Sequence, residues 1–173
     1  DQVKIIHNGF SPYQHSKNTI KNKTRNFIQK NKLPEDFLLF TGVLDPRKNL
    51  IGLIKALSVL KKERKDCPDL VIAGIPAKDW RMSNQYKKAA QFKLLRHIHV
   101  IGILEKDILY GITEKALALC YPSLYEGFGF PPLEAMSQGV PVLAGDNSSI
   151  PEITGDAACL VNALSIGDMV NGL

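Results

Sequence analysis

The sequence has 173 residues, of which 45% are hydrophobic and 23% are charged, a composition typical of one globular domain and not of disordered, collagen-like or coiled-coil chains. The formal net charge is +5, but all 22 bases lie before residue 116, together with 11 acids, and six acids without a base follow residue 120. The basic segments lack interleaved aromatic residues, which argues against nucleic acid binding and leaves an anionic membrane, a neighbouring domain or water as their surroundings.

Short β-branched runs alternate with segments of helical period, the pattern of a parallel sheet flanked by helices. In the first half of the chain we expect strands at residues 3–6, 36–43, 70–73 and 99–101. Residues 14–35 form a connection with room for a helix, and further helices are expected at residues 49–64 and 82–96. The helix at 49–64 has the clearest pattern, because five apolar residues fall on one face: Leu50, Leu53, Ile54, Leu57 and Leu60.

The second half continues the alternation. We expect a helix at 106–116, a strand at 117–121, a loop with a short helix that Pro131 and Pro132 open, and strands at 140–144 and 158–161. The sequence therefore predicts an α/β domain with a Rossmann-like parallel sheet and helices on both faces. Such a sheet binds ligands at the carboxyl ends of its strands. The motifs GxxxxGK[ST] and GxGxxG do not occur, which excludes a P-loop and a dinucleotide fingerprint as written.

Glycine or charged residues follow three of these strands, at residues 42–49, 74–76 and 122–134. In the third segment, glycines let the backbone approach a ligand, and the amides of Leu133 and Glu134 at a helix start suit a diphosphate. Glu126 and Glu134 would repel phosphate, so we expect them to accept hydrogen bonds from the vicinal hydroxyls of a ribose or hexose. The alternative is a glycine loop with a helix-start glutamate and no ligand.

Arg47 and Lys48 stand at the start of a predicted helix, where the helix dipole disfavours a base. A phosphate would supply a favourable partner, and two cations could neutralise a departing diphosphate without a metal. The alternative is that both side chains are merely solvated. Their place on the same predicted sheet edge as the glutamate loop favours the phosphate.

The segment YPSLYEGFGFPPLEAMSQGVPVLA at 121–144 resembles the family-four group of retaining glycosyltransferases, which have the two-domain GT-B fold and a Glu-x7-Glu signature. GVLDPRKNLIGLIKAL, LVIAGIP, IHVIGIL and SSIPEITGDAACLVN resemble further segments of that group, so the similarity covers about residues 36–162. HNGF at 7–10 resembles the group's Pro-Asn-Gly turn, with His7 in place of proline. Val43 stands where many members place an arginine.

The resemblance implies roles for individual residues. Glu134 would hold the ribose, Glu126 the hydroxyls of the donor sugar, and Arg47 with Lys48 the diphosphate; Glu126, Arg47 and Lys48 are the expected catalytic residues. The remaining expected substrate-binding positions are amides that contact phosphate (Gly129, Leu133), the neighbourhood of the base (Gly102, Ile103) and three further contacts (Gly42, Gly74, Phe128).

A GT-B enzyme needs two facing domains, and the predicted single domain at 1–173 corresponds to the donor-binding half alone. We therefore expect a fragment of a larger enzyme, inactive by itself and lacking an N-terminal acceptor domain. The resemblance implies a hexosyltransferase, specifically a mannosyltransferase of polysaccharide or glycoconjugate synthesis. The alternatives are a noncatalytic nucleotide- or saccharide-binding module and, from the basic half, a nucleic-acid-binding protein.

The expected partners are a nucleotide-diphosphate sugar, with GDP-mannose favoured over UDP-sugars, and a saccharide or lipid-linked acceptor. No cofactor and no metal are expected, because no Asp-x-Asp pair is present to hold a divalent ion. Three cysteines without a CxxC pair indicate a reducing compartment. The absence of a signal-peptide pattern and of an apolar run of ~20 residues indicates a cytoplasmic protein, with peripheral association at the inner face of the membrane as an option.

Overall fold

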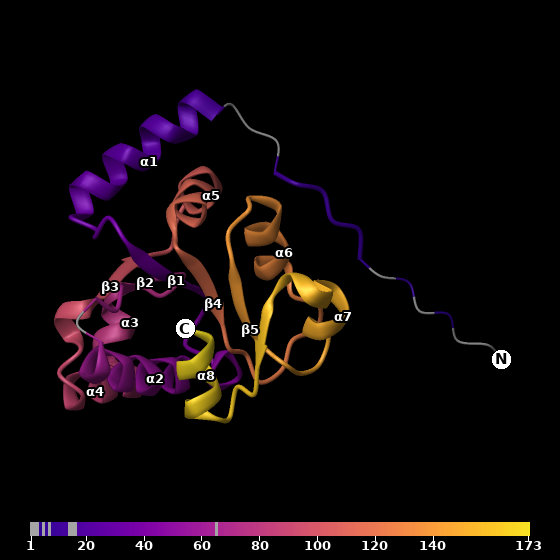
Figure 1. The fold of residues 1–173 in the computed structure, drawn as a ribbon. Coiled ribbons are helices and arrows are strands. Elements are labelled where there is room, and N and C mark those ends of the chain that lie inside the picture. The colour runs from indigo at the N-terminus through magenta and orange to yellow at the C-terminus, as the bar shows by residue number, and fades with distance from the viewer. Residues whose placement is uncertain (1–3, 5, 7, 14–16, 65) are drawn as a thin grey trace.

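The computed structural model describes residues 4, 6, 8–13, 17–64 and 66–173. Within them, six parallel strands form one sheet in the order β3-β2-β1-β4-β5-β6 (Figure 1). The strands are β1 (Phe37–Thr41), β2 (Asp69–Ala73), β3 (Ile98–Gly102), β4 (Ala118–Tyr121), β5 (Val142–Gly145) and β6 (Cys159–Val161). This is a Rossmann-like sheet, and the direction of strand order reverses between β1 and β4, where such folds bind ligands.

Helices cover both faces of the sheet, as Figure 1 shows. One face carries α2 (Leu50–Glu63), α3 (Ala77–Met82), α4 (Asn84–Gln91) and α8 (Ile166–Gly172). The other face carries α1 (Lys17–Asn31), α5 (Lys106–Lys115), α6 (Phe130–Ser137) and α7 (Ile150–Thr154). Short 3-10 turns complete the described elements: η1 (Pro46–Lys48), η2 (Leu95–His97) and η3 (Gly155–Ala157). The predicted fold class is confirmed.

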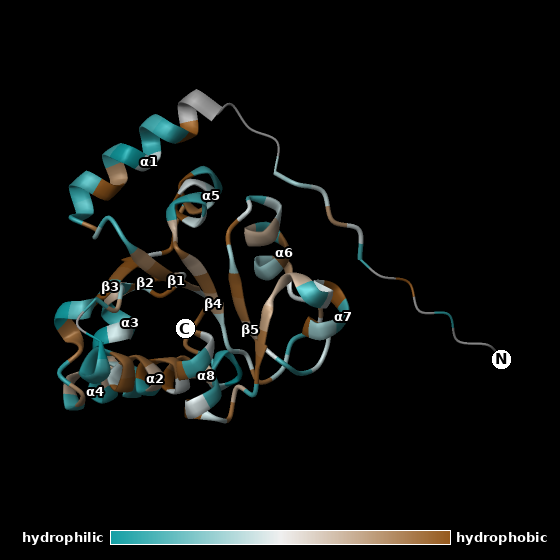
Figure 2. Ribbon diagram, viewed as in Figure 1, coloured by the Kyte–Doolittle hydropathy of each residue, from teal (hydrophilic) through white to brown (hydrophobic). Residues whose placement is uncertain are grey.

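The central strand β1 shows why two cores form. Successive side chains of a strand point to opposite faces, so Phe37 and Leu39 pack with the layer of α5 and α6, whereas Leu38 and Phe40 pack with α2. All four are buried, which explains the uninterrupted apolar run of this strand. Figure 2 shows mostly hydrophobic strands between helices in which hydrophobic and hydrophilic residues alternate.

Two predicted elements are wrong. The helix expected at 82–96 is shorter, because α4 covers only Asn84–Gln91, and α3, which was not expected, precedes it. The Ser83 hydroxyl accepts a hydrogen bond from the Tyr86 amide and caps the start of α4, and Lys93, with a φ of 58°, follows its end. Of the strand expected at 3–6, Val3 and Ile5 lie outside the described residues, and Lys4 and Ile6 belong to no strand. His7 of the HNGF turn also lies outside the described residues.

In the part of the chain that the structure describes, no helix is long and apolar enough to cross a membrane.

Candidate functional site

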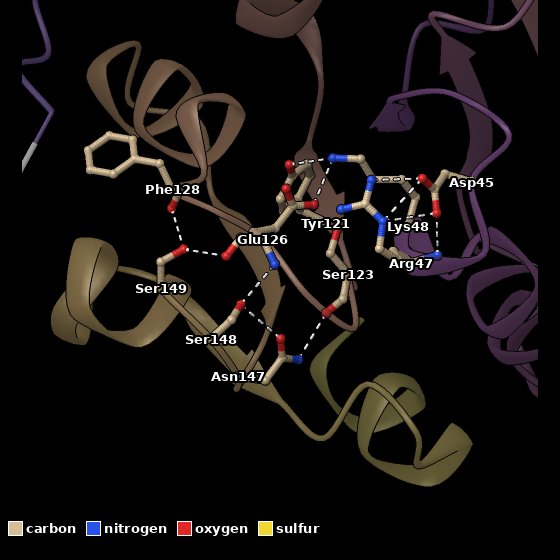
Figure 3. A network of polar contacts seen from close by, with 10 residues as sticks. All are labelled: Asp45, Arg47, Lys48, Tyr121, Ser123, Glu126, Phe128, Asn147, Ser148 and Ser149. Atoms are coloured by element: carbon tan, nitrogen blue, oxygen red, sulfur yellow. Dashed lines mark hydrogen bonds and ion pairs between the residues drawn. The ribbon is translucent and has the colours of Figure 1, made fainter.

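The candidate site lies where β1 and β4 end, at the point of reversal in strand order. Lys48 follows β1 in η1, and Glu126 follows β4 in the glycine-rich loop. The Lys48 ammonium donates to Oε1 of Glu126 at 2.7 Å and to the hydroxyl of Tyr121 at 2.8 Å (Figure 3). The side chains of Lys48 and Glu126 are only 17% and 11% exposed. The fold thus brings together two of the three predicted catalytic residues in a half-buried ion pair.

The surroundings of Glu126 keep it ionised. Burial by itself raises the pKa of this carboxyl, but the hydrogen bond from Lys48 and the nearby hydroxyls of Ser123 and Tyr121 outweigh burial and lower it below its usual value. Burial and the nearby Glu126 carboxylate raise the pKa of the Tyr121 hydroxyl, so that Tyr121 stays protonated and neutral. At neutral pH the site therefore contains a carboxylate, an ammonium and a neutral phenol in mutual contact.

Arg47 has a different partner. The Asp45 carboxylate accepts hydrogen bonds from the Arg47 backbone amide at 2.8 Å and from its guanidinium at 2.8 Å and 3.1 Å. These bonds hold the pKa of Asp45 below its usual value. We expected a base at this helix start to require a phosphate, but Asp45 already supplies an acid two residues away. The sequence analysis missed this residue, although Asp before Pro at a turn start is a recognisable capping signal.

The loop between β4 and α6, which carries Glu126, is held by hydrogen bonds from the segment that follows β5. The Ser148 hydroxyl accepts from the Glu126 amide at 2.9 Å, and the Ser149 hydroxyl donates to the carbonyls of Glu126 at 3.1 Å and of Phe128 at 2.7 Å (Figure 3). The Asn147 side-chain amide donates to the Ser123 carbonyl at 2.9 Å. Three consecutive polar side chains therefore fix the backbone that carries Glu126. The sequence analysis did not single them out, because their partners are backbone atoms more than twenty residues away.

Glu134 lies in the first two turns of α6, at the border of two adjoining pockets. A pocket of about 150 Å³ is lined by Glu134 together with Thr41, Gly42, Lys48 and Pro131. A smaller pocket of about 70 Å³ is also lined by Glu134, together with Tyr13, Tyr110 and Lys106. Burial raises the pKa of Glu134, and the positive charge of Lys106 opposes this rise. Glu134 and Lys48 thus line the same pocket, as the sequence analysis predicted for one edge of the sheet.

The predicted glycines take structural roles of their own. A Cβ on Gly74 would lie 2.6 Å from the Gly42 carbonyl oxygen, so the strand ends of β1 and β2 approach closely only without a side chain there. The Gly74 amide donates to the Gly102 carbonyl at 2.8 Å, which joins the third glycine to this edge. Gly129 has a φ of 110°, and a Cβ on it would lie 2.7 Å from Ile150 and Ile153 of α7.

The other predicted contacts are less close to the ion pair. The Phe128 ring packs against Phe130 with centroids 4.8 Å apart and points away from Lys48 in Figure 3. Ile103 follows β3 and is 76% exposed. The helix containing Leu133 begins at Phe130, with Pro131 and Pro132 in its first turn as expected, whereas Glu134 lies beyond that first turn and not within it. The ligand contacts of these positions stay predictions.

Fold and site together define the class of protein. Residues 21–171 match the family of glycosyl transferases group 1, and the chain belongs to that family.

Among individual proteins, the chain is 37% identical over 139 residues to the O-antigen chain mannosyltransferase RfbU of Salmonella typhimurium, covering 79% of this chain and 36% of RfbU. It is 33% identical over 136 residues to the O-antigen chain mannosyltransferase B of Escherichia coli, covering 78% of this chain and 35% of that protein. The chain therefore spans about a third of the length of these relatives.

Solved structures give the same fold. The chain superimposes on HepE of Anabaena, a structure in complex with UDP and glucose, with a TM-score of 0.75 and 22% identity, covering 97% of this chain and 45% of HepE. It also matches the C-terminal domain of a group 1 glycosyltransferase, LpcC of Francisella tularensis, with a TM-score of 0.69 and 24% identity, covering 94% of this chain and 82% of that structure. Its structural neighbours are GT-B glycosyltransferases.

Proposed function

We propose that this domain binds the nucleotide-diphosphate sugar donor of a retaining hexosyltransferase. The observation that carries the proposal is the placement of Lys48, Glu126 and Glu134 around one edge of the sheet, at the reversal of strand order. A nucleotide sugar has an anionic diphosphate between two polyhydroxylated rings. One cation between two carboxylates at a sheet edge matches that order of charge and hydroxyls.

Each side chain binds the group of the donor that its charge and hydrogen-bonding capacity match. Lys48 contacts the diphosphate, with Arg47 as a second cation nearby. Glu126 accepts from hydroxyls of the sugar, and Glu134 accepts from the ribose. When the sugar leaves, negative charge accumulates on the diphosphate, and the two cations stabilise it electrostatically. The diphosphate oxygen on the same face then assists deprotonation of the acceptor hydroxyl, which gives retention at the anomeric carbon.

The donor we favour is GDP-mannose, and the whole protein transfers mannose to a saccharide or lipid-linked acceptor. Support comes from the relatives, since RfbU and O-antigen chain mannosyltransferase B are mannosyltransferases of O-antigen chains. HepE, solved with UDP and glucose, supports the broader class of nucleotide-sugar ligand. The acceptor domain belongs to the part of the relatives that this chain does not cover. A site of action at the cytoplasmic face of the membrane completes the proposal.

Calorimetric titration of the 173-residue chain with GDP, UDP and ADP, and with GDP-mannose and UDP-glucose, tests the proposal. We expect binding of at least one nucleoside diphosphate and no transfer of sugar by the chain alone, because half of a GT-B cleft is missing. The same titrations with Lys48→Met define the site. Undiminished binding by Lys48→Met, or binding of none of these ligands, would contradict the proposed donor site, and transfer by the chain alone would contradict its inactivity.

A further inference from the structure

Tyr121 contacts Lys48 of the candidate site, although the sequence analysis assigned it no role. It is the last residue of β4, and its side chain is only 2% exposed. Its ring packs in the core layer of α5 and α6. Its hydroxyl lies 2.8 Å from the Lys48 ammonium, which is also 4.8 Å from the centre of the ring. One end of this side chain is thus anchored in the core, and the other end contacts the predicted diphosphate-binding lysine.

The hydrogen bonds of Lys48 leave one donor free. An ammonium has three N–H groups. Tyr121 and Glu126 accept from two of them, and among the described residues Lys48 makes no third hydrogen bond. The third N–H is available for an oxygen atom of a ligand in the pocket that Lys48 lines.

The two acceptors differ in what they do to the charge. Glu126 is a carboxylate and neutralises Lys48, and it is the residue that the donor sugar would engage. Tyr121 is a neutral acceptor, so it can hold the ammonium while the positive charge remains available to an anion. A free lysine side chain loses rotamer freedom when it is fixed in one position. A partner anchored in the core reduces the entropy that Lys48 loses when it binds a phosphate.

We propose that Tyr121 is a positioning residue that holds Lys48 toward the diphosphate of the donor. The inference rests on the proposed function, because it requires Lys48 to contact the diphosphate. On binding, Glu126 turns to the sugar hydroxyls, and the Tyr121 hydroxyl and ring keep the ammonium in place. Tyr121 makes no contact with the donor itself.

The test is a double-mutant cycle of Tyr121→Phe and Lys48→Met in the 173-residue chain, titrated with GDP and with guanosine, or with UDP and uridine if the titrations above select uracil. Phenylalanine keeps the ring and its packing and removes only the hydroxyl. We expect Tyr121→Phe to weaken GDP binding about 3- to 10-fold, the worth of one net hydrogen bond, and to leave guanosine binding unchanged. In the Lys48→Met background, Tyr121→Phe should have no further effect.

Tyr86→Phe is the matched control, since Tyr86 packs edge-on against Trp80 on the other face of the sheet and loses the same hydroxyl. It should leave GDP binding unchanged. If Lys48→Met does not weaken GDP binding, the proposed function fails. If Lys48→Met weakens it but Tyr121→Phe does not, or does so equally in both backgrounds, the positioning role of Tyr121 is wrong and the proposed function stands. Thermal melts of all variants identify any loss of folded protein.

Discussion

Lys48 and Glu126 neutralise each other across 78 residues of sequence, with 2.7 Å between the ammonium and the carboxylate. In the proposed site, a bound donor would therefore replace Glu126 as the partner of Lys48, and Lys48 as the partner of Glu126. In the proposed donor site, a nucleoside diphosphate without its sugar would compete with Glu126 for Lys48, whereas a complete donor would offer each of the two residues a new partner.

Removing the carboxylate should therefore not weaken binding of the diphosphate. We expect Glu126→Gln to bind GDP at least as tightly as the native chain, because Lys48 no longer has a competing anion. Isothermal titration at low salt measures this. In the complete enzyme the same substitution should lower sugar transfer. A clear loss of GDP affinity in Glu126→Gln would mean that Glu126 shapes the loop and does not face the sugar.

Glu134 should matter for every ligand that carries a ribose. Glu134→Ala should weaken GDP binding by about 1–3 kcal/mol, the range for hydrogen bonds to a charged group. Inorganic pyrophosphate, which has no ribose, is the matched ligand and should bind both forms equally. Equal losses with GDP and pyrophosphate would indicate instead that the substitution disturbs the start of α6.

Two glycines at the same edge should respond differently to alanine. Gly74→Ala places a Cβ 2.6 Å from the Gly42 carbonyl oxygen at a φ of 95°, whereas Gly102→Ala at a φ of 79° meets no atom within 4 Å. Both substitutions carry the strain of the left-handed region, but only Gly74→Ala also forces β1 and β2 apart. We expect Gly74→Ala to lower the free energy of unfolding by about 1–3 kcal/mol more than Gly102→Ala. Urea unfolding measures both free energies. Equal losses of free energy would show that β1 and β2 can move apart at little cost.

Stability at acid pH should depend on Asp69 at the opposite end of β2. Burial by itself raises the pKa of Asp69, but hydrogen bonds from Lys61, His99 and His97 bring it down from 3.8 to about 2. Because this pKa is lower in the folded chain, the carboxylate stabilises the fold above about pH 4, and the contribution disappears as the pH falls toward 2. After screening by solvent it amounts to roughly 1–2 kcal/mol.

The control for this acid dependence is Asp69→Asn, which retains the size of the side chain. Between pH 5 and pH 2 its free energy of unfolding should fall less steeply than that of the native chain. Parallel curves would show that the cluster of Asp69, Lys61 and the two histidines adds no pH-dependent stability.

The sequence predicted the strands well because each buried strand reads as a short apolar run followed by glycine or a polar turn, as at β1 and β2. It failed at the end of the helix expected at 82–96, because α4 ends at Gln91 and Lys93 takes a left-handed φ of 58°, which the pattern of apolar residues does not reveal. In the site, the pairing of Lys48 with Glu126 could be placed at one edge from the strand order expected of the fold. The contribution of Tyr121 could not, since an aromatic residue at the end of a buried strand is equally consistent with core packing alone.

Strand order also separates charge in space. The acid-only part of the chain from residue 121 forms β5, β6 and their helices, while all 22 bases precede residue 116, in the part of the chain that includes β1, β2 and β3. The formal charge is thus +11 for residues 1–120, with 22 bases and 11 acids, and −6 for residues 121–173, on the two sides of the reversal in strand order. We expect an anion to be attracted to the side of β1, the strand that Lys48 follows. Association at low ionic strength should consequently be faster than collision with a uniformly charged domain of the same net charge.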